Sequence, residues 1–94
     1  MKQAVIRKTL TGNWEEFNFG KNNKNFFVKN FSNSDIFVSF VNNDEESGSF
    51  KIASGYAEEV SIIQNHVSGQ LETSKIYIKG TGEVEVEALD IFFN

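Results

Sequence analysis

Apolar and polar residues alternate with a period of two along much of the chain. The clearest run is residues 83–87, Glu-Val-Glu-Val-Glu, in which carboxylates and valines occupy alternate positions. Residues two apart lie on the same face of a β-strand, and no helical period fits this run. Residues 36–41 and 75–79 show the same alternation. The pattern predicts half-buried strands that pack one face against a core and turn the other to solvent.

Turn-forming residues interrupt these runs at short intervals. Clusters of Gly, Asn, Asp and Ser mark the breaks, and these residues favour the backbone conformations of tight turns. We expect about eight short strands, near residues 3–10, 14–19, 25–30, 35–41, 49–53, 57–63, 74–79 and 83–92. Strands of this length and spacing predict an all-β fold, a single-domain antiparallel β-sandwich or jelly-roll-like barrel over residues 1–94.

Residues 56–67 allow a second interpretation, because Tyr56, Val60, Ile63 and Val67 fall at helical spacing. Residues 60–63 are mostly β-branched, however, and branching at Cβ restricts side-chain rotamers in a helix. We therefore expect a strand in this segment.

The apolar pattern changes face near the end of the last predicted strand. Residues 84, 86 and 88 share one face, whereas the apolar residues 89, 91 and 93 share the other. A one-residue bulge near Ala88 would reconcile the two sets. Alternatively, the strand leaves its sheet, and the tail of residues 91–93 packs elsewhere in the domain or against a partner.

The composition narrows the possible chemistry. The chain has 94 residues, enough for one domain, with no cysteine and a single histidine, His66. Lack of cysteine excludes disulfides, thiolate metal sites and a cysteine nucleophile. With a single histidine, a histidine-rich metal site cannot form, and a nucleophile–base pair could use only His66. We therefore expect no enzymatic activity, no cofactor and no metal. The start is too polar for a signal peptide and no apolar run is long enough to span a bilayer, so we expect a cytoplasmic chain without a membrane partner.

Charge is distributed unevenly along the sequence. The net charge is −4, but residues 1–30 carry six basic and two acidic side chains, and residues 31–94 carry three basic and eleven acidic ones. A basic N-terminal segment, about residues 1–12, thus precedes an acidic body. This asymmetry suits docking onto copies of the chain or onto a larger assembly.

Three short segments contain residue types that also occur in ligand sites. Residues 42–48 are rich in oxygen side chains, but their spacing does not match a helix–loop–helix calcium site, and we expect a solvated hairpin tip. Residues 80–82, Gly-Thr-Gly, lack the lysine and the helix of a phosphate loop, and we expect a hairpin turn. The glutamates at 83, 85 and 87 are expected to face solvent and to oppose edge-to-edge aggregation.

An aromatic and basic cluster supports a nucleic-acid hypothesis. Aromatic residues are interleaved with lysines at Trp14, Phe17, Phe19, Phe26, Phe27 and Phe31, with Lys21, Lys24 and Lys29. Residues 35–40 also resemble the second aromatic motif of cold-shock domains, small barrels that bind single strands. Residues 24–28 do not match the first motif of that family, and a net charge of −4 opposes phosphate binding. Single-stranded nucleic acid is therefore an alternative and not the expected partner.

A broader resemblance covers about two thirds of the chain. Its segments are residues 28–30 (Val-Lys-Asn), a Ser/Asp-rich turn, residues 35–40, residues 52–55 (Ile-Ala-Ser-Gly) and residues 76–86, where Ile-Tyr-Ile-Lys-Gly precedes alternating Glu and Val. This succession resembles small accessory virion proteins of tailed bacteriophages. Residues 52–55 depart from the pattern by lacking the proline that such proteins commonly have there.

The resemblance implies a non-enzymatic decoration or stabilising subunit on the capsid, with a neck or tail position as the alternative. Its partners would be the major capsid protein or another virion protein and further copies of itself, and its location would be the virion, assembled in the bacterial cytoplasm. A carbohydrate-binding module that uses exposed aromatic residues is a further alternative. In this interpretation Lys2, Arg7 and Lys8 pair with acidic capsid surface or with a neighbour's Glu83, Glu85 and Glu87, and the apolar contacts are Trp14, Phe27, Ile91, Phe92 and Phe93.

Overall fold

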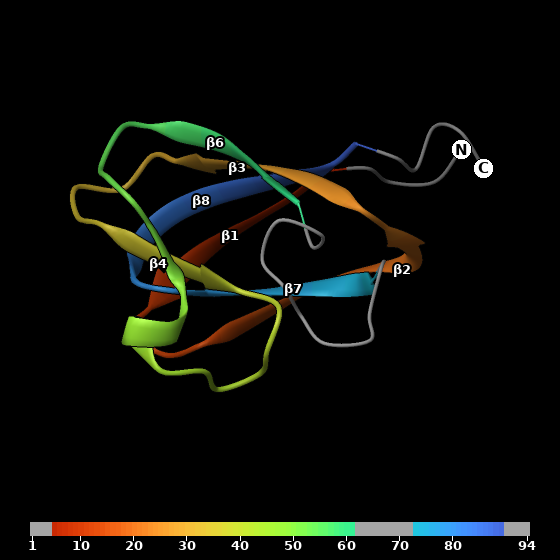
Figure 1. The fold of residues 1–94 in the computed structure, drawn as a ribbon. Helices are drawn as coiled ribbons and strands as arrows, with labels where there is room; N and C mark the ends of the chain where they lie inside the picture. The colour runs from red at the N-terminus through yellow and green to blue at the C-terminus, as the bar shows by residue number, and fades with distance from the viewer. Residues whose placement is uncertain (1–4, 62–72, 90–94) are drawn as a thin grey trace.

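The computed structural model describes residues 5–61 and 73–89, which form two antiparallel sheets of four strands each (Figure 1). The strands are β1 (Val5–Thr11), β2 (Glu15–Asn23), β3 (Asn25–Asn30), β4 (Ile36–Ser39), β5 (Phe50–Ile52), β6 (Ala57–Ser61), β7 (Thr73–Lys79) and β8 (Thr81–Ala88). A short 3₁₀ helix, η1 (Glu46–Gly48), lies between β4 and β5. Each strand overlaps one predicted from the alternation, so the all-β sandwich is confirmed.

The order of the strands is that of a jelly roll. One sheet, called here the β1 sheet, has the order β1-β8-β3-β6, and the other, the β2 sheet, has the order β2-β7-β4-β5. All pairings between these strands are antiparallel. Apart from the β4–β5 hairpin, every connection crosses from one sheet to the other. Two interlocked Greek keys of this kind define the jelly-roll topology.

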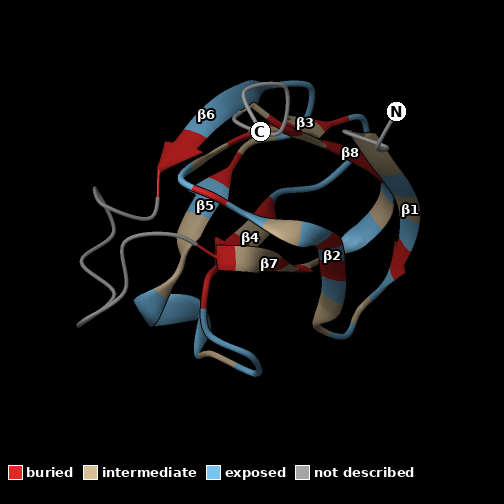
Figure 2. Cartoon of the chain, turned by 90° about the vertical axis from the view of Figure 1, so that its right-hand side faces the viewer, coloured by how far each residue is buried: buried red, intermediate tan, exposed pale blue. Residues whose placement is uncertain are grey.

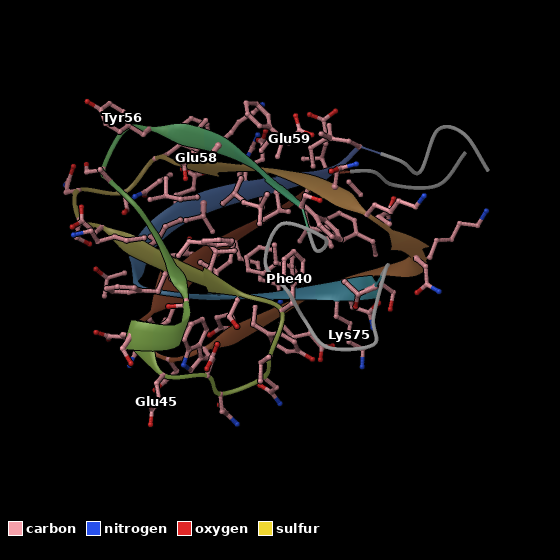
Figure 3. All side chains as sticks on the ribbon, in the orientation of Figure 1. Phe40, Glu45, Tyr56, Glu58, Glu59 and Lys75 are labelled. Atoms are coloured by element: carbon pink, nitrogen blue, oxygen red, sulfur yellow. The ribbon has the colours of Figure 1, made fainter. Side chains whose placement is uncertain are left out.

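The inward faces of the two sheets form one hydrophobic core, seen as red segments along the strands in Figure 2. Phe19 and Phe40 each pack against Phe26, with ring centroids 5.6 and 5.9 Å from it in tilted arrangements. Figure 3 shows Phe40 between the two layers. Along each strand, side chains therefore point alternately into this core and towards an outer face. The outer faces of the two sheets are exposed surfaces that other molecules can contact.

The turn at Gly80 corrects one expectation. The segment was expected to be a hairpin turn, but β7 and β8 belong to different sheets, so the chain turns a corner between layers instead. The corner is crowded, because a Cβ atom on Gly80 would lie 2.8 Å from the Ile36 Cγ2 methyl. A glycine is required here because the backbone at the end of β7 passes close to the start of β4, the neighbouring strand of the same sheet.

The other irregularities lie elsewhere than expected. The pairing of β8 with β3 is regular from Val84 to Ala88, so the described part of this strand has no bulge. The register shifts instead on β2, between Asn18 and Asn23, where Gly20 has a φ of +76°. Residues 57–61 are a strand, as predicted. The remainder of the segment that allowed a helix, including His66, lies outside the described residues, as does the apolar tail of residues 91–93.

Candidate interaction surface

The outer face of the β1 sheet carries a stripe of carboxylates. On β8 the residues 84, 86 and 88 are fully buried in the core, which places Glu83, Glu85 and Glu87 on the opposite face. The Glu-Val alternation predicted this outer-face position, but the expectation that all three glutamates face solvent and protect a sheet edge was wrong, because Glu85 is buried and β8 is an inner strand. Because β8 lies between β1 and β3, the middle glutamate has a strand on both sides.

The middle glutamate, Glu85, is clamped between two cations. Strand pairing sets Arg7 of β1 and Lys29 of β3 opposite Glu85. Arg7 Nη2 and Nε donate to Glu85 Oε1 at 2.6 and 3.2 Å, and Lys29 Nζ donates to Oε2 at 3.1 Å. The side chain of Glu85 is only 10% exposed although it lies on an outer face. We call these three residues the charged row.

Electrostatics follow from this geometry. The hydrogen bonds from Arg7 and then from Lys29 lower the pKa of the Glu85 carboxyl, and partial burial opposes them more weakly. The pairing with Glu85 also raises the pKa of the Arg7 guanidinium. The charged row is thus a charge-assisted hydrogen-bond network whose members hold one another in place.

Two aromatic side chains accompany the charged row. Phe27 lies two residues before Lys29 on β3, and Lys29 Nζ is 5.5 Å from the centre of its ring. Phe31 lies two residues after Lys29 and is 56% exposed, while its backbone N–H donates to the Glu83 carbonyl at 3.0 Å. An exposed phenylalanine fixed to the next strand by its backbone presents apolar area at little entropic cost. Phe31 is absent from the contact residues expected from sequence, although its position in the aromatic cluster was the available signal.

The contact residues predicted from the sequence do not lie on one surface. The outer face of the β1 sheet holds Arg7, Phe27, Glu83, Glu85 and Glu87. Lys8 is adjacent to Arg7 on β1, so its side chain points to the opposite face of the strand, towards β2. There its amine donates to the Glu16 carbonyl at 2.6 Å and lies 5.1 Å from the centre of the Phe17 ring. Trp14 is partly buried just before β2 of the other sheet. Lys2, Ile91, Phe92 and Phe93 lie outside the described residues.

The cations of β1 have partners within the chain. The sequence suggested that Arg7 would pair with an acidic surface elsewhere or with the glutamates of a neighbour. In the structure its guanidinium bonds Glu85 and lies 3.4 Å from Glu83 Oε2 of the same chain, although 62% of the side chain stays exposed. Arg7 therefore stabilises the outer face of its own chain. A partner could contact only the part of its side chain that stays exposed while it pairs with Glu85.

A buried polar cluster, which we call the polar corner, joins two turns, the one after β3 and the one after β5. Asn30, only 1% exposed, donates through Nδ2 to the carbonyls of Ser34 (2.9 Å) and Ile52 (3.1 Å). Its Oδ1 accepts from the backbone N–H and the hydroxyl of Ser32 at 2.9 and 2.6 Å. Ser54 Oγ donates to the Ser32 carbonyl at 2.6 Å. These are residues of the segments on which the phage resemblance rests, and here their function is to lock the turns together.

The nucleic-acid hypothesis loses much of its expected stacking platform. Phe17 and Phe26 are fully buried and Phe19 is 8% exposed, all within the core. A ring that packs inside a sandwich cannot stack on a base. The expected platform is thereby reduced to Phe27 and Phe31, on or next to β3 of the β1 sheet, and Trp14, which precedes β2 of the other sheet.

The acidic loop between β4 and β5 is organised by its own hydrogen bonds. Asp44 Oδ2 accepts from Ser39 Oγ at 2.7 Å, and Asp44 Oδ1 accepts from the Glu45 backbone N–H at 2.8 Å. Within the described parts of the chain, no group of three or more His, Asp or Glu residues is placed to hold a metal ion. Residues 5–61 and 73–89 also contain no helix long and apolar enough to cross a bilayer.

Comparisons of the chain with models of protein families, with curated proteins and with solved structures gave no match.

The charged row predicts an acid sensitivity of folding. Because the Glu85 pKa is lower in the folded chain than its ordinary value of 4.5, the unfolded chain binds a proton more readily as the pH falls. The stabilisation by Glu85 is therefore complete at neutral pH and is lost on acidification from about pH 5 downwards. We expect the unfolding free energy of Glu85→Gln, from urea titrations, to fall less steeply between pH 6 and 3 than that of the native chain. Glu45→Gln, at an exposed carboxylate of the loop between β4 and β5, serves as the control and should follow the native curve.

Proposed function

We propose that the chain is a non-enzymatic structural protein of a tailed-bacteriophage particle, and that it acts through protein–protein contact at the outer face of the β1 sheet. The observation that carries this proposal is the exposed Phe31, which follows Lys29 of the charged row by two residues and is bonded through its backbone to Glu83 of β8. Together these residues provide apolar contact area next to charges that are already ordered before any partner binds.

The physical case concerns the cost of association. Binding loses free energy when flexible side chains must be immobilised, about 0.5–1.5 kcal/mol for each long one. Arg7 and Lys29 are already fixed by Glu85, so much of this cost is met on folding. Phe31 then contributes favourably when its exposed ring is buried, by about 25 cal/mol for each Å² removed from water. Such a preordered patch suits a permanent contact.

The particle setting is supported by two further points. The succession of turns and strands resembles accessory virion proteins of tailed phages, and the jelly roll is a topology that viral capsid domains use, as do lectins and cupins. A domain of 94 residues buries only roughly 60–65% of its unfolded surface, so assembly would add stability that its own core does not supply. Because one topology serves many functions, the contact surface must be tested directly.

The test uses two exposed apolar residues as a matched pair. Phe31 lies beside the charged row, whereas Val41, 49% exposed, follows β4 of the other sheet. We expect Phe31→Ser to weaken binding of the purified chain to isolated phage heads at least about tenfold, the equivalent of about 1.4 kcal/mol. Val41→Ser should stay within about twofold of the native chain, since this difference corresponds to about 0.4 kcal/mol.

The measurement is co-sedimentation of labelled chain with heads and, separately, with tails, which also distinguishes a capsid position from a neck or tail position. Equal loss in both variants would remove the outer face from the proposal. Failure of the native chain to bind either part of the particle would contradict the proposal itself.

A further inference from the structure

We propose that copies of this chain join side by side, with the β6 edge of one copy against the β1 edge of the next. The partner of these edges is then a second copy of the chain. This inference rests on the proposed structural function and deepens it, because it names one partner and the surface that meets it.

The β1 sheet ends in two edge strands. Among the described residues, β1 pairs only with β8, and β6 pairs only with β3. An edge strand presents backbone N–H and C=O groups at alternate residues, and another strand can bond to them. Figure 3 shows Glu58 and Glu59 on β6 at the outside of the sandwich, and residues 57–59 of this strand are exposed.

The two edges carry opposite charge. β1 contains Arg7 and Lys8 and no acidic residue, whereas β6 contains Glu58 and Glu59 and no basic residue. Both cations of β1 have partners within the chain, but 62% of the Arg7 side chain stays exposed and the Lys8 amine bonds a neutral carbonyl, so both positive charges remain at this edge. Opposite charges on facing strands stabilise a pairing, and like charges destabilise it. Two β6 edges or two β1 edges therefore repel each other, while a β1 edge and a β6 edge attract.

The second layer shows the same complementarity with the signs reversed. Its edge strand β2 begins with Glu15 and Glu16 and carries a single base, Lys21, while the opposite edge strand β5 carries Lys51. When copies stand side by side, the basic β1 meets the acidic β6 in one layer, and the acidic start of β2 meets the basic β5 in the other. Both layers thus favour the same neighbour.

Strand direction permits this contact without rotating the neighbour. Each sheet has four antiparallel strands, so its two end strands run in opposite directions. A copy displaced sideways therefore presents β1 antiparallel to β6, and β2 antiparallel to β5, with the outer faces on the same side. The contact is head-to-tail and leaves a free edge at each end, so it can continue from copy to copy.

Two charge variants test this arrangement. The first, E58K/E59K, makes the β6 edge basic like the β1 edge. The second, T9E/T11E, neutralises the net charge of β1 at two exposed positions. We expect the native chain to form oligomers whose mean mass in sedimentation velocity rises with concentration and falls with added salt. Each variant alone should sediment near the 10.6 kDa of one chain.

An equimolar mixture of the two variants provides the decisive result. The first variant keeps a native β1 edge and the second keeps a native β6 edge, so one native contact forms between them. We expect a 1:1 dimer of the two variants and no larger species. If thermal unfolding shows that a double variant is not folded, the corresponding single variant, Glu58→Lys or Thr11→Glu, replaces it in the same experiment.

A native chain that stays monomeric at all concentrations would overturn the inference, as would self-association of either variant to the native extent or a mixture that forms no dimer. Binding of the first variant to phage heads is measured in parallel. If edge pairing fails while the variant and the native chain both bind heads, the inference falls and the proposed function stands. If edge pairing succeeds while neither the native chain nor the first variant binds heads, the proposed function falls and the inference stands.

Discussion

Replacing Asn30 by alanine is expected to lower the free energy of unfolding by about 3–5 kcal/mol, because buried polar groups left without partners cost about 1–3 kcal/mol each. The change would strand the Ile52 carbonyl and the backbone N–H of Ser32, which bond the Asn30 amide, and would leave the Ser34 carbonyl with only the Ser32 hydroxyl. A small domain has a total stability of only about 5–15 kcal/mol, so this single change would remove much of it. Asn30→Asp keeps an acceptor but turns a carboxylate oxygen towards two carbonyls, and it should lose at least as much.

Urea unfolding followed by tryptophan fluorescence checks this prediction, with Asn33→Ala as the control. Asn33 lies in the same turn but is exposed, so its truncation should change the unfolding free energy by no more than about 0.5 kcal/mol. Similar losses in both variants would mean that the polar corner is not what holds the two turns together.

Replacing Gly82 by alanine is the second change with a large expected effect. Its φ is +98°, and a Cβ atom would lie 2.5 Å from Ser32 Cβ and 3.2 Å from Ser32 Cα. Gly12 has nearly the same φ, +99°, with nothing within 4 Å of the added atom. We expect Gly12→Ala to cost about 1–2 kcal/mol from backbone strain alone. Gly82→Ala should cost about 1–3 kcal/mol more, because the turn must move to admit the methyl group.

The difference between these two alanine variants isolates the contact between the corner at Gly82 and the turn at Ser32. Thermal and urea unfolding of both proteins give that difference directly. Equal destabilisation would show that the turn yields freely, and the close approach would then contribute nothing to the stability of the corner.

The strands could be predicted from the sequence because each carries a local signal. The alternation at residues 83–87 sets the outer and inner faces of β8 without reference to any other part of the chain. The layer to which each strand belongs is not encoded locally. The Gly-Thr-Gly segment at residues 80–82 therefore looked like a hairpin turn, although the chain there crosses between sheets. The two arrangements differ in strand pairing, since β7 pairs with β2 and β4 whereas β8 pairs with β1 and β3, and these partners are distant in the sequence.

The candidate surface was predictable to a smaller extent. The glutamate stripe and Phe27 follow from alternation, but the partner of Arg7 depends on which strands are neighbours. β1 and β8 lie at opposite ends of the sequence and pair directly, so Arg7 finds Glu85 in its own chain and not in a neighbour. Likewise, Lys8 was grouped with Arg7 on the basis of charge, although adjacent residues of a strand point to opposite faces.

Within the described parts of the chain, the charged groups with displaced pKa values, Arg7 and Glu85, bond each other on an outer face. The polar corner and the charged row stabilise the sandwich, and in the proposed function the edges and Phe31 are the surfaces that contact other chains. Rigid domains with complementary edges suit a protein that works by occupying a fixed place in an assembly.

The most direct measurement of the proposed function is quantitative mass spectrometry of phage particles that are gradient-purified from a lysate containing the chain, compared with that lysate. The account predicts that the protein is retained on the particles through salt washing at a fixed ratio to the major capsid protein or to a tail protein. Particles that are complete and infectious yet contain none of the chain, while the lysate contains it, would contradict the account.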